Sequence, residues 1–289
     1  MRKARMHAFD YVNYVILALV ILVTLYPVWY VLIGSLNDGV DYLKGGVGLF
    51  PRVFTLANYK VVFLDNGIWH AYLITFLRTI VGTVCALIFT SAVGYAMSRK
   101  NLKFRQPIYW FSIFTMFFSG GLIPGFLVIK VLGLYNTFWV YIIPSLYSVY
   151  NMIIVQNFFS TIPEELHDAA LIDGMRELRI YFSVYMPLAK PVLATLALWI
   201  IVGHWNSYFD TMVYTSDPNL QTLQYYLMRM IQTANISTNN PALGDVLDRI
   251  TPETVTFSAI MVSILPILIV YPFLQKYFVK GIFLGSLKS

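Results

Sequence analysis

The sequence predicts an all-α membrane protein with six transmembrane helices. Hydrophobic residues make up 58% of the 289 residues, charged residues make up only 12%, and mean hydropathy is +0.67. In a soluble globular protein about a quarter of the residues are charged, so this composition excludes that class. Since a helical span takes roughly 20 residues, the chain has room for about six spans and two substantial loops.

The expected spans are long apolar segments separated by polar or glycine-rich ones. The first follows three basic residues and is too long for a signal-peptide core, so we interpret it as a retained span. In the third, two glycines and a proline within 120–124 interrupt the helix, and broken backbone at membrane depth requires protein or water around it. In chain order the expected spans are 11–37, 70–98, the uncharged segment that begins at Pro107, 137–159, 191–209 and 253–275.

These spans divide the chain into a short N-terminus, a transmembrane domain and a tail. The three parts are 1–10, 11–279 and 280–289. Two long loops, 38–69 and 211–252, lie on one side of the membrane, and a third, 161–190, lies on the other. A loop as long as 211–252 is more often functional or disordered than a plain connector.

The basic residues predict the orientation in the bilayer. With six spans, both termini lie on the same side as the 99–105 hairpin and the 161–190 loop. With the C-terminal part counted from Lys276, these segments hold thirteen Lys and Arg residues against six on the other side. Positively charged loops face the cytoplasm, so we expect a multi-pass protein of the cytoplasmic membrane with both termini inside. The formal charge of +6 then reflects topology rather than nucleic-acid binding.

The stretch 161–191 is the only long polar, helix-forming segment between strongly apolar ones. Thr161 and Glu164 have the spacing of a capping box, in which each side chain bonds the other residue's backbone N–H. Gly174 permits a bend, and a second helical pattern runs up to Pro187. One narrow face, at helical spacing, consists of Leu166, Ala169, Ala170 and Asp173. Such a helix–turn–helix is suited to being held by another protein; the plain alternative is a solvated loop helix.

The order E-E-L-x-D-A-A-x-x-D-G-(x12)-P-(x3)-P in this stretch resembles the EAA loop of permease subunits in binding-protein-dependent ABC importers, above all the maltose-type carbohydrate branch. Asp168 stands where that family usually has glutamate, and Met175 where it has alanine. The resemblance implies the type I ABC importer permease fold, with a cytoplasmic coupling helix seated in a groove of the ATPase subunit. The residues implied in ATPase coupling are Glu164, Glu165, Asp168, Ala169, Ala170, Asp173, Gly174 and Pro187.

Polar and aromatic side chains in the fourth and fifth spans are candidates for a solute pathway. Polar groups in hydrocarbon are costly unless they face protein or water. Aromatic rings beside amides and carboxylates suit a sugar, and the W-N-x-x-F spacing at 205–209 also resembles the sugar permeases. The alternative is that these residues join helices or anchor the outer interface. The candidates are Asn151, Trp205, Asn206, Tyr208 and Asp210.

Arg78 and the C-terminal tail each have two interpretations. Arg78 lies near the outer end of the second span, where we expect it to snorkel or bond carbonyls rather than act in gating or as a counter-ion. The ending K-G-x-x-x-G-S-x-K resembles that of sugar permeases, whose maltose-type members extend it between the ATPase subunits; a frayed basic end is the ordinary alternative. The matching residues are Lys280, Gly281, Gly285 and Ser286.

No enzymatic or metal site is expected. The chain contains no G-x-x-x-x-G-K-[ST] sequence, so ATP and Mg²⁺ are expected on partner ATPase subunits and no cofactor on this chain. The four histidines are far apart and lack metal-ligand spacing. No Ser/His/Asp arrangement and no pair of carboxylates is expected at membrane depth.

Together these features predict one membrane subunit of an ABC importer that moves a carbohydrate, expected to be an oligosaccharide, by alternating access. The implied partners are a second permease subunit in a heterodimer, a dimer of ABC ATPases, an extracytoplasmic solute-binding protein that meets 211–252, and membrane lipid, but not nucleic acid. The alternatives are a permease for a non-sugar solute, a secondary transporter, whose buried ionisable residues and repeat are scarce here, and a membrane-embedded enzyme.

Overall fold

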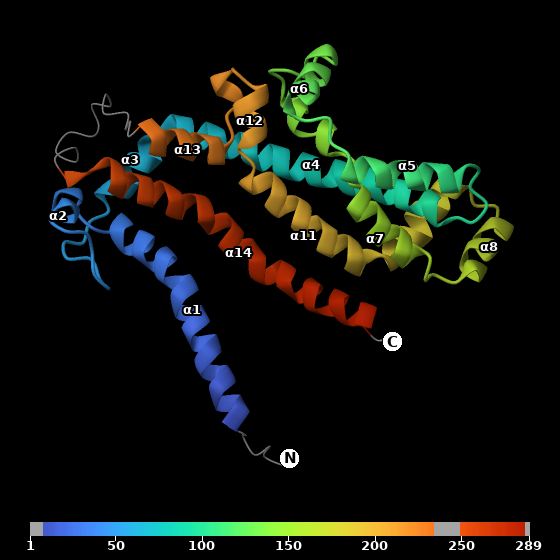
Figure 1. Cartoon of the computed structure of the whole chain (residues 1–289), viewed down its shortest axis with the longest axis horizontal. Coiled ribbons are helices and arrows are strands. Elements are labelled where there is room, and N and C mark those ends of the chain that lie inside the picture. The colour runs from blue at the N-terminus through green and yellow to red at the C-terminus, as the bar shows by residue number, and fades with distance from the viewer. Residues whose placement is uncertain (1–7, 234–248, 287–289) are drawn as a thin grey trace. The chain divides into compact units, whose positions relative to one another are not determined.

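Figure 1 shows the computed structural model, which describes the backbone of residues 8–233 and 249–286 and the side chains of residues 9–232 and 249–269. The described residues form helices and no strand, apart from an isolated bridge between Asn37 and Phe54, so the all-α prediction is confirmed. The chain separates into two compact units. Unit 1 comprises 1–69 and 227–266, and unit 2 comprises 70–226 and 267–289.

Within the described residues, three helices are long and apolar enough to cross a membrane by themselves, in Phe9–Ser35, Asn66–Ser98 and Pro252–Ile269. Three further pairs of helices qualify as bent spans, so the described residues hold up to six spans. The bent pairs, with their angles, are Arg105–Phe117 with Leu122–Val131 (119°), Phe138–Ser145 with Val149–Phe159 (49°), and Glu177–Leu188 with Lys190–Asn206 (84°).

Four of the predicted spans agree with long helices, and their starts agree to within four residues. Their ends differ more, because the last helix continues beyond its predicted end at 275. These helices are α1 (Ala8–Ser35), α4 (Asn66–Ser98), α11 (Lys190–Asn206) and α14 (Pro252–Ser286).

The interruption predicted in the third span is confirmed. α5 (Arg105–Phe117) ends, and the chain turns through Gly121 into α6 (Leu122–Val131). Gly121 has φ 87° and ψ 178°, a backbone conformation that is essentially restricted to glycine. This residue allows the sharp turn between the two helices.

The fourth predicted span, 137–159, is not one continuous helix. It consists of η1 (Phe138–Tyr141), η2 (Ile143–Ser145) and α7 (Val149–Phe159). Pro144 lies in the first turn of η2, and Ser148 starts a new helix by accepting a hydrogen bond from the backbone N–H of Asn151 at 3.3 Å. The proline and the N-cap serine together divide the span.

Unit 1 is organised around Asn58, whose side chain is fully buried. Its Nδ2 donates to the carbonyls of Ser35 at 3.0 Å and Asn37 at 2.9 Å, and its Oδ1 accepts from Thr254 Oγ1 at 2.8 Å. One amide therefore joins the end of α1, the middle of α3 and the first turn of α14. The shorter helices of unit 1 are α2 (Gly39–Leu43) and α3 (Ala57–Leu64).

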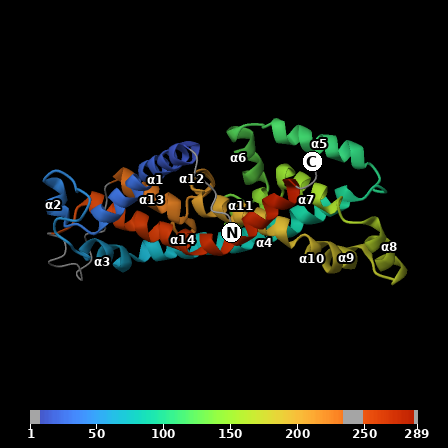
Figure 2. The same cartoon turned by 90° about the horizontal axis from the view of Figure 1, so that it is seen from below.

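Unit 2 contains the polar stretch 161–191, and α8 (Glu164–Ile172) lies at one end of the unit in both Figure 1 and Figure 2. α4 runs the length of the unit. The remaining elements are α9 (Glu177–Ile180), the π-helix η3 (Tyr181–Tyr185), α10 (Met186–Leu188), α12 (Phe209–Tyr214), η4 (Pro218–Leu220) and α13 (Leu223–Thr233).

The first half of α4 holds the start of the predicted 211–252 loop. His70 Nε2 lies 2.8 Å from the carbonyl of Asn219, and the backbone N–H of Leu223 donates to Thr75 Oγ1 at 2.8 Å. This part of the loop is therefore packed and partly helical rather than extended. Residues 234–248 of the loop lie outside the described residues.

Candidate functional site

α8 is the helix expected in the stretch 161–191, but its N-terminus differs from the prediction. The helix begins at Glu164, with Pro163 as its N-cap and no side-chain cap. The hydroxyl of Thr161 donates instead to the carbonyl of Phe158 at 2.8 Å. The predicted capping box is therefore wrong: the helix begins too late for Thr161 to cap it, and Glu164 is its first residue rather than its third.

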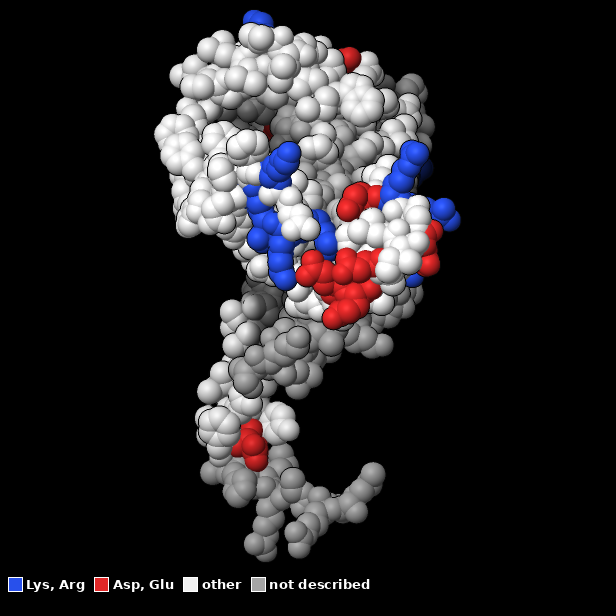
Figure 3. Space-filling model, turned by 90° about the vertical axis from the view of Figure 1, so that its right-hand side faces the viewer, with Lys and Arg blue, Asp and Glu red and all other residues white. Residues whose placement is uncertain are grey.

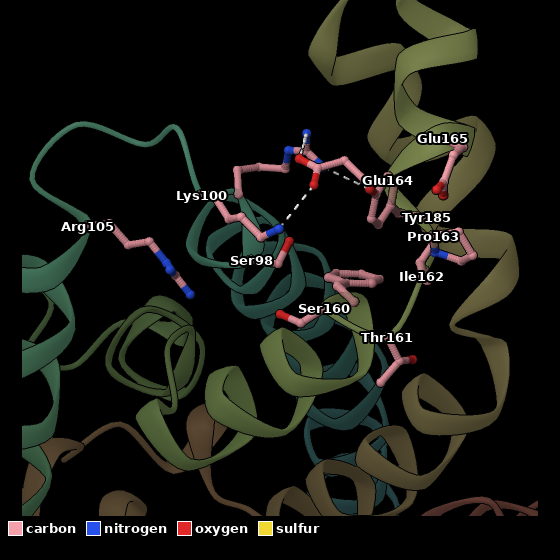
Figure 4. A pocket seen from close by; sticks show the side chains of 12 residues that line it. Ser98, Lys100, Arg105, Ser160, Thr161, Ile162, Pro163, Glu164, Glu165 and Tyr185 are labelled. Carbon is pink, nitrogen blue, oxygen red and sulfur yellow. Dashed lines mark hydrogen bonds and ion pairs between the residues drawn. The ribbon is translucent and has the colours of Figure 1, made fainter.

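Glu164 connects α8 to the end of α4. Its carboxylate lies 3.2 Å from Lys100 Nζ and 3.7 Å from Arg99 Nη2. Figure 4 shows Lys100 and Glu164 pointing toward each other. The Lys100 pair is exposed, and exposed pairs contribute at most about 1 kcal/mol. A cavity of about 530 Å³ lies beside these pairs, with Lys100 and Arg105 approaching from the α4–α5 connection and Glu164 and Glu165 from α8.

Most of α8 faces away from unit 2. Among its nine residues only His167 and Ala170 are buried, while Ile172 is 87% exposed. Figure 3 views this end of unit 2 and shows Asp and Glu side chains beside Lys and Arg side chains. Of the predicted narrow face only Ala170 packs inward, so the buried face runs through His167 and Ala170 and leaves Ala169 exposed.

The bend predicted at Gly174 is confirmed. Gly174 has φ 76°, its N–H donates to the carbonyl of Leu171 at 2.9 Å, and the N–H of Met175 donates to that of Ala170 at 3.0 Å. This pair of bonds after the C-cap Asp173 is a Schellman motif, which satisfies the last carbonyls of a helix and favours glycine at the left-handed position. A glycine here therefore ends α8 and turns the chain toward α9.

The helical segment after the bend continues one residue beyond Pro187, to Leu188. Pro187 lies in the first turn of α10, where its missing N–H costs little. Before it comes η3, a single π-helical stretch, which is a rare geometry often found at functional sites. Tyr181 and Tyr185, at the two ends of η3, are both buried.

Sequence reasoning missed a polar cluster beneath α8. His167 is 3% exposed; its Nδ1 lies 2.9 Å from Arg99 Nη2 and its Nε2 lies 3.2 Å from Glu177 Oε1. Tyr95 donates to the other oxygen of Glu177 at 2.5 Å, and Arg99 Nη1 donates to Tyr185 Oη at 3.0 Å. The signal in the sequence is the four-residue spacing of Ser91, Tyr95 and Arg99, which puts the first two on one face of α4 and continues just past its end at Ser98.

The structure groups four of the five solute-pathway candidates at the junction of α11 and α12. Trp205 is 6% exposed and meets Tyr72 edge to face at 6.1 Å, whereas Tyr208 is 42% exposed. Asn206 is exposed, and its Nδ2 donates to the carbonyl of Val202 at 2.9 Å. Asn151 lies apart from them in the sequence, in the first turn of α7.

Arg78 does not snorkel, so that expectation is wrong. Its side chain is 2% exposed, forms an ion pair with Asp210 and lies over the ring of Tyr141 at 4.5 Å. The carboxylate of Asp210 also accepts from Ser207 Oγ at 2.9 Å. Both oxygens of the Asp210 carboxylate are therefore engaged within the chain. The reason is tertiary: α12 brings a carboxylate to a guanidinium that has no counter-charge nearby in sequence.

The predicted tail contacts fall at the edge of the described structure. Lys280, Gly281, Gly285 and Ser286 lie where the backbone continues α14, and their side chains are outside the described residues. Among the residues that the structure describes, no three His, Cys, Asp or Glu side chains gather in a group able to hold a metal ion.

The chain is similar to a known protein family, to characterised relatives and to a solved structure. The model of the family "Binding-protein-dependent transport system inner membrane component" matches residues 86–284. Protein LplC of Bacillus subtilis (strain 168) is 36% identical over 97% of this chain and 95% of its own length. The polygalacturonan/rhamnogalacturonan transport system permease protein YtcP of the same organism is 34% identical over 97% and 98%.

A solved structure agrees with the fold. It is the crystal structure of a bacterial ABC transporter involved in the import of the acidic polysaccharide alginate, with a TM-score of 0.89, 34% identity, and coverage of 96% of this chain and 100% of that one. Binding-protein-dependent systems work with ATPase subunits and a solute-binding protein. The chain therefore belongs to the family of inner membrane components of binding-protein-dependent transport systems, and it is a permease subunit of an ABC importer rather than an enzyme.

Proposed function

We propose that this permease moves an oligosaccharide or polysaccharide fragment and that α8 is its coupling helix. The substrate class rests on the relatives: YtcP is named for polygalacturonan and rhamnogalacturonan, and the solved transporter for alginate. The exposed Tyr208 offers an aromatic face to a sugar ring, Asn151 and Asn206 offer amides, and the buried Trp205 supports this part of α11. Asp210 contributes indirectly, by holding α12 against α4 through Arg78.

The observation that carries the coupling role is the exposure of α8 together with its Schellman ending. A nine-residue helix with two buried residues presents most of its surface to a partner, and the turn at Gly174 fixes the angle at which it does so. We propose that a groove of the ATPase subunit receives this surface. The proposed contacts are Glu164, Glu165, Asp168, Ala169, Ala170 and Asp173 on α8, with Gly174 and Pro187 shaping the bend.

The proposed assembly is a heterodimer of this chain with a second permease, bound to two ATPase subunits that hold ATP and Mg²⁺. Both termini and α8 lie in the cytoplasm, and the tail at 280–289 extends toward the ATPases. The loops 38–69 and 211–252 face a solute-binding protein on the other side. When ATP closes the ATPase dimer, α8 is carried with its groove, and the spans of unit 2 rearrange to open the opposite side.

Substitution of Gly174 tests the coupling role. Valine is strongly disfavoured at φ 76°, whereas asparagine tolerates the left-handed region. In cells that co-express the importer subunits, Gly174→Val is expected to insert in the membrane but lose the copurifying P-loop ATPase, and Gly174→Asn to retain it. Full ATPase recovery with Gly174→Val would overturn the assignment.

A second experiment tests the substrate class. The complex is reconstituted with its solute-binding protein in liposomes, and ATP hydrolysis is measured against a panel of neutral oligosaccharides, uronic-acid oligosaccharides, amino acids and short peptides. Stimulation by an oligosaccharide alone supports the proposal. Stimulation by an amino acid or peptide and by no sugar would replace it with a permease for a non-sugar solute.

A further inference from the structure

The second half of α4 and the residue that follows the helix carry three polar side chains, all of which bond the segment after the α8 bend. Ser91 and Tyr95 are four residues apart and therefore lie on one face of α4, and Arg99, one residue beyond the end of the helix at Ser98, continues this spacing. Ser91 Oγ lies 2.7 Å from Tyr181 Oη, Tyr95 Oη donates to Glu177, and Arg99 Nη1 donates to Tyr185 Oη. We call this row of contacts between α4 and 177–185 the polar seam.

The polar seam lies against a packed aromatic core. The rings of Tyr95 and Tyr185 are 4.7 Å apart, and Phe159 of α7 meets Tyr185 at 5.4 Å. Tyr181 and Tyr185 are each at most 2% exposed. Because hydrogen bonds strengthen in such a low-dielectric setting and the buried partners cannot turn to water, α4 and 177–185 behave as one rigid piece.

His167 is the side chain that attaches α8 to this piece. A guanidinium only donates hydrogen bonds, so the 2.9 Å contact from Arg99 makes Nδ1 of His167 an acceptor. The imidazole proton is then on Nε2, which donates to Glu177 at 3.2 Å. Asp168 lies 3.4 Å from Nδ1, but two acceptors do not bond, so it adds nothing in this tautomer. The His167 ring therefore joins Arg99 on one side of the polar seam to Glu177 on the other.

Little else holds α8 in place. Ala170 is its only other buried residue, and the Glu164 pairs are exposed and weak by comparison. We infer that His167 is a positioning residue: it fastens α8 to α4 and 177–185, so that the three move as a single body when the ATPase moves α8. This inference rests on the proposed coupling role of α8. Loss of the bridge leaves α8 seated in its groove but loosely joined to the spans.

The test is a distance measurement by double electron–electron resonance. Spin labels are placed on Ile172 of α8 and Ile88 of α4, both exposed, after replacement of the single native cysteine, Cys85, by alanine. The chain is purified with its second permease and ATPase subunits, with and without Mg-ATP. The expected distribution is narrow and has the same centre in both conditions.

Three variants separate positioning from a general structural effect. His167→Leu is expected to broaden the distribution and to shift its centre with Mg-ATP. His167→Gln, whose amide provides one acceptor and one donor, is expected to restore the narrow distribution. The matched control is Gln156→Leu, which changes another buried polar side chain of unit 2 whose Oε1 has no hydrogen-bond partner, and it should leave the distribution narrow.

A double substitution checks that His167 and Arg99 act together. Because both belong to one cluster, Arg99→Met with His167→Leu should broaden the distribution no more than the more severe single variant. A centre that moves with Mg-ATP in the unsubstituted chain, or a narrow distribution in His167→Leu, would overturn the inference. If the ATPase fails to copurify with the unsubstituted chain, the proposed function fails instead, and the widths in the permease alone still decide whether His167 holds α8.

Discussion

The guanidinium of Arg78 on α4 is bound to the carboxylate of Asp210 on α12, although the two residues are 132 positions apart in the chain. Arg78 is 2% exposed and lies over the ring of Tyr141, while Asp210 is 22% exposed. The pair therefore joins the first half of α4 to α12, the helix that follows α11. Its first consequence concerns stability, because a buried charge depends on its partner.

Replacement of Arg78 by methionine is expected to destabilise unit 2 strongly. Breaking a buried pair by removing one partner costs about 3 kcal/mol, because the remaining charge is left uncompensated. The measurement is thermal unfolding in detergent, followed by reaction of a thiol-specific dye with Cys85, the only cysteine and a partly buried residue of α4.

The control is Lys100→Met, which breaks the exposed pair with Glu164 and should cost less than about 1 kcal/mol. The double variant Arg78→Met with Asp210→Leu should recover part of the loss, because no charge then remains unpaired. Equal melting temperatures for Arg78→Met and Lys100→Met would show that the buried pair contributes no more to stability than the exposed one.

Two glycines of unit 2 are expected to respond differently to the same change. A Cβ at Gly82 of α4 would collide with the ring of His204, whereas a Cβ at Gly203 of α11 meets open space. Overpacking of this kind costs about 1–3 kcal/mol, so Gly82→Ala should lower the melting temperature and Gly203→Ala should not. The same dye assay measures both. If the clash is the cause, His204→Ala should rescue Gly82→Ala, and failure of that rescue would contradict the explanation.

Replacement of Asn58 by aspartate, which exchanges the amide nitrogen for an oxygen, is expected to destabilise unit 1. Asn58→Asp would direct an oxygen at the carbonyls of Ser35 and Asn37, which now accept from Nδ2. Each buried group left without a partner costs about 1–3 kcal/mol. Hydrogen exchange by mass spectrometry should therefore show faster exchange in α3 and at the end of α1, with α4 unaffected beyond its first turn.

The matched substitution is Asn101→Asp, in the exposed turn after α4. It makes the same chemical change without burial and should leave exchange in α3 unaltered. Similar exchange in α3 for the two variants would mean that Asn58 does not organise unit 1.

The pH dependence of the first loop should follow Asp41. The hydrogen bond from Arg52 Nε at 2.9 Å, followed by that from Asn37, lowers the pKa of the Asp41 carboxyl below its usual 3.8. Because the pKa in the folded state is lower than in the unfolded state, the ionised carboxylate stabilises the loop above 3.8, and this contribution is lost as pH falls through the lower folded value.

A spin label on the exposed Gly48, in the Cys85→Ala background, reports this change as increased mobility at acid pH. In Arg52→Gln the pKa of Asp41 returns toward its usual value, so the increase should begin at a higher pH than in the parent. An identical pH profile for parent and variant would exclude Asp41 as the responsible group.

The local features of the proposed coupling site were predictable, and its attachment to the bundle was not. Gly174 predicts the end of α8, because the left-handed backbone conformation that ends a helix favours glycine. The predicted capping box was wrong because the spacing of Thr161 and Glu164 does not determine which residue begins the helix; the helix begins only after Pro163. The role of His167 could not be predicted, because a single histidine has no recognisable role until the fold brings Arg99 and Glu177 within hydrogen-bonding distance of it.

By itself, the sequence determined what depends on neighbouring residues: a helical membrane protein, the approximate positions of its spans, the break at Gly121 and the bend at Gly174. Hydropathy, helix periodicity and glycine conformation act over a few residues, so they can be read along the chain. The tertiary structure alone decided that Arg78 is paired and buried, that Asn58 joins three helices, and that His167 fastens α8 to α4. Those outcomes depend on which distant groups the fold brings within hydrogen-bonding distance, because a polar side chain is stable inside the bundle only when another part of the chain satisfies it.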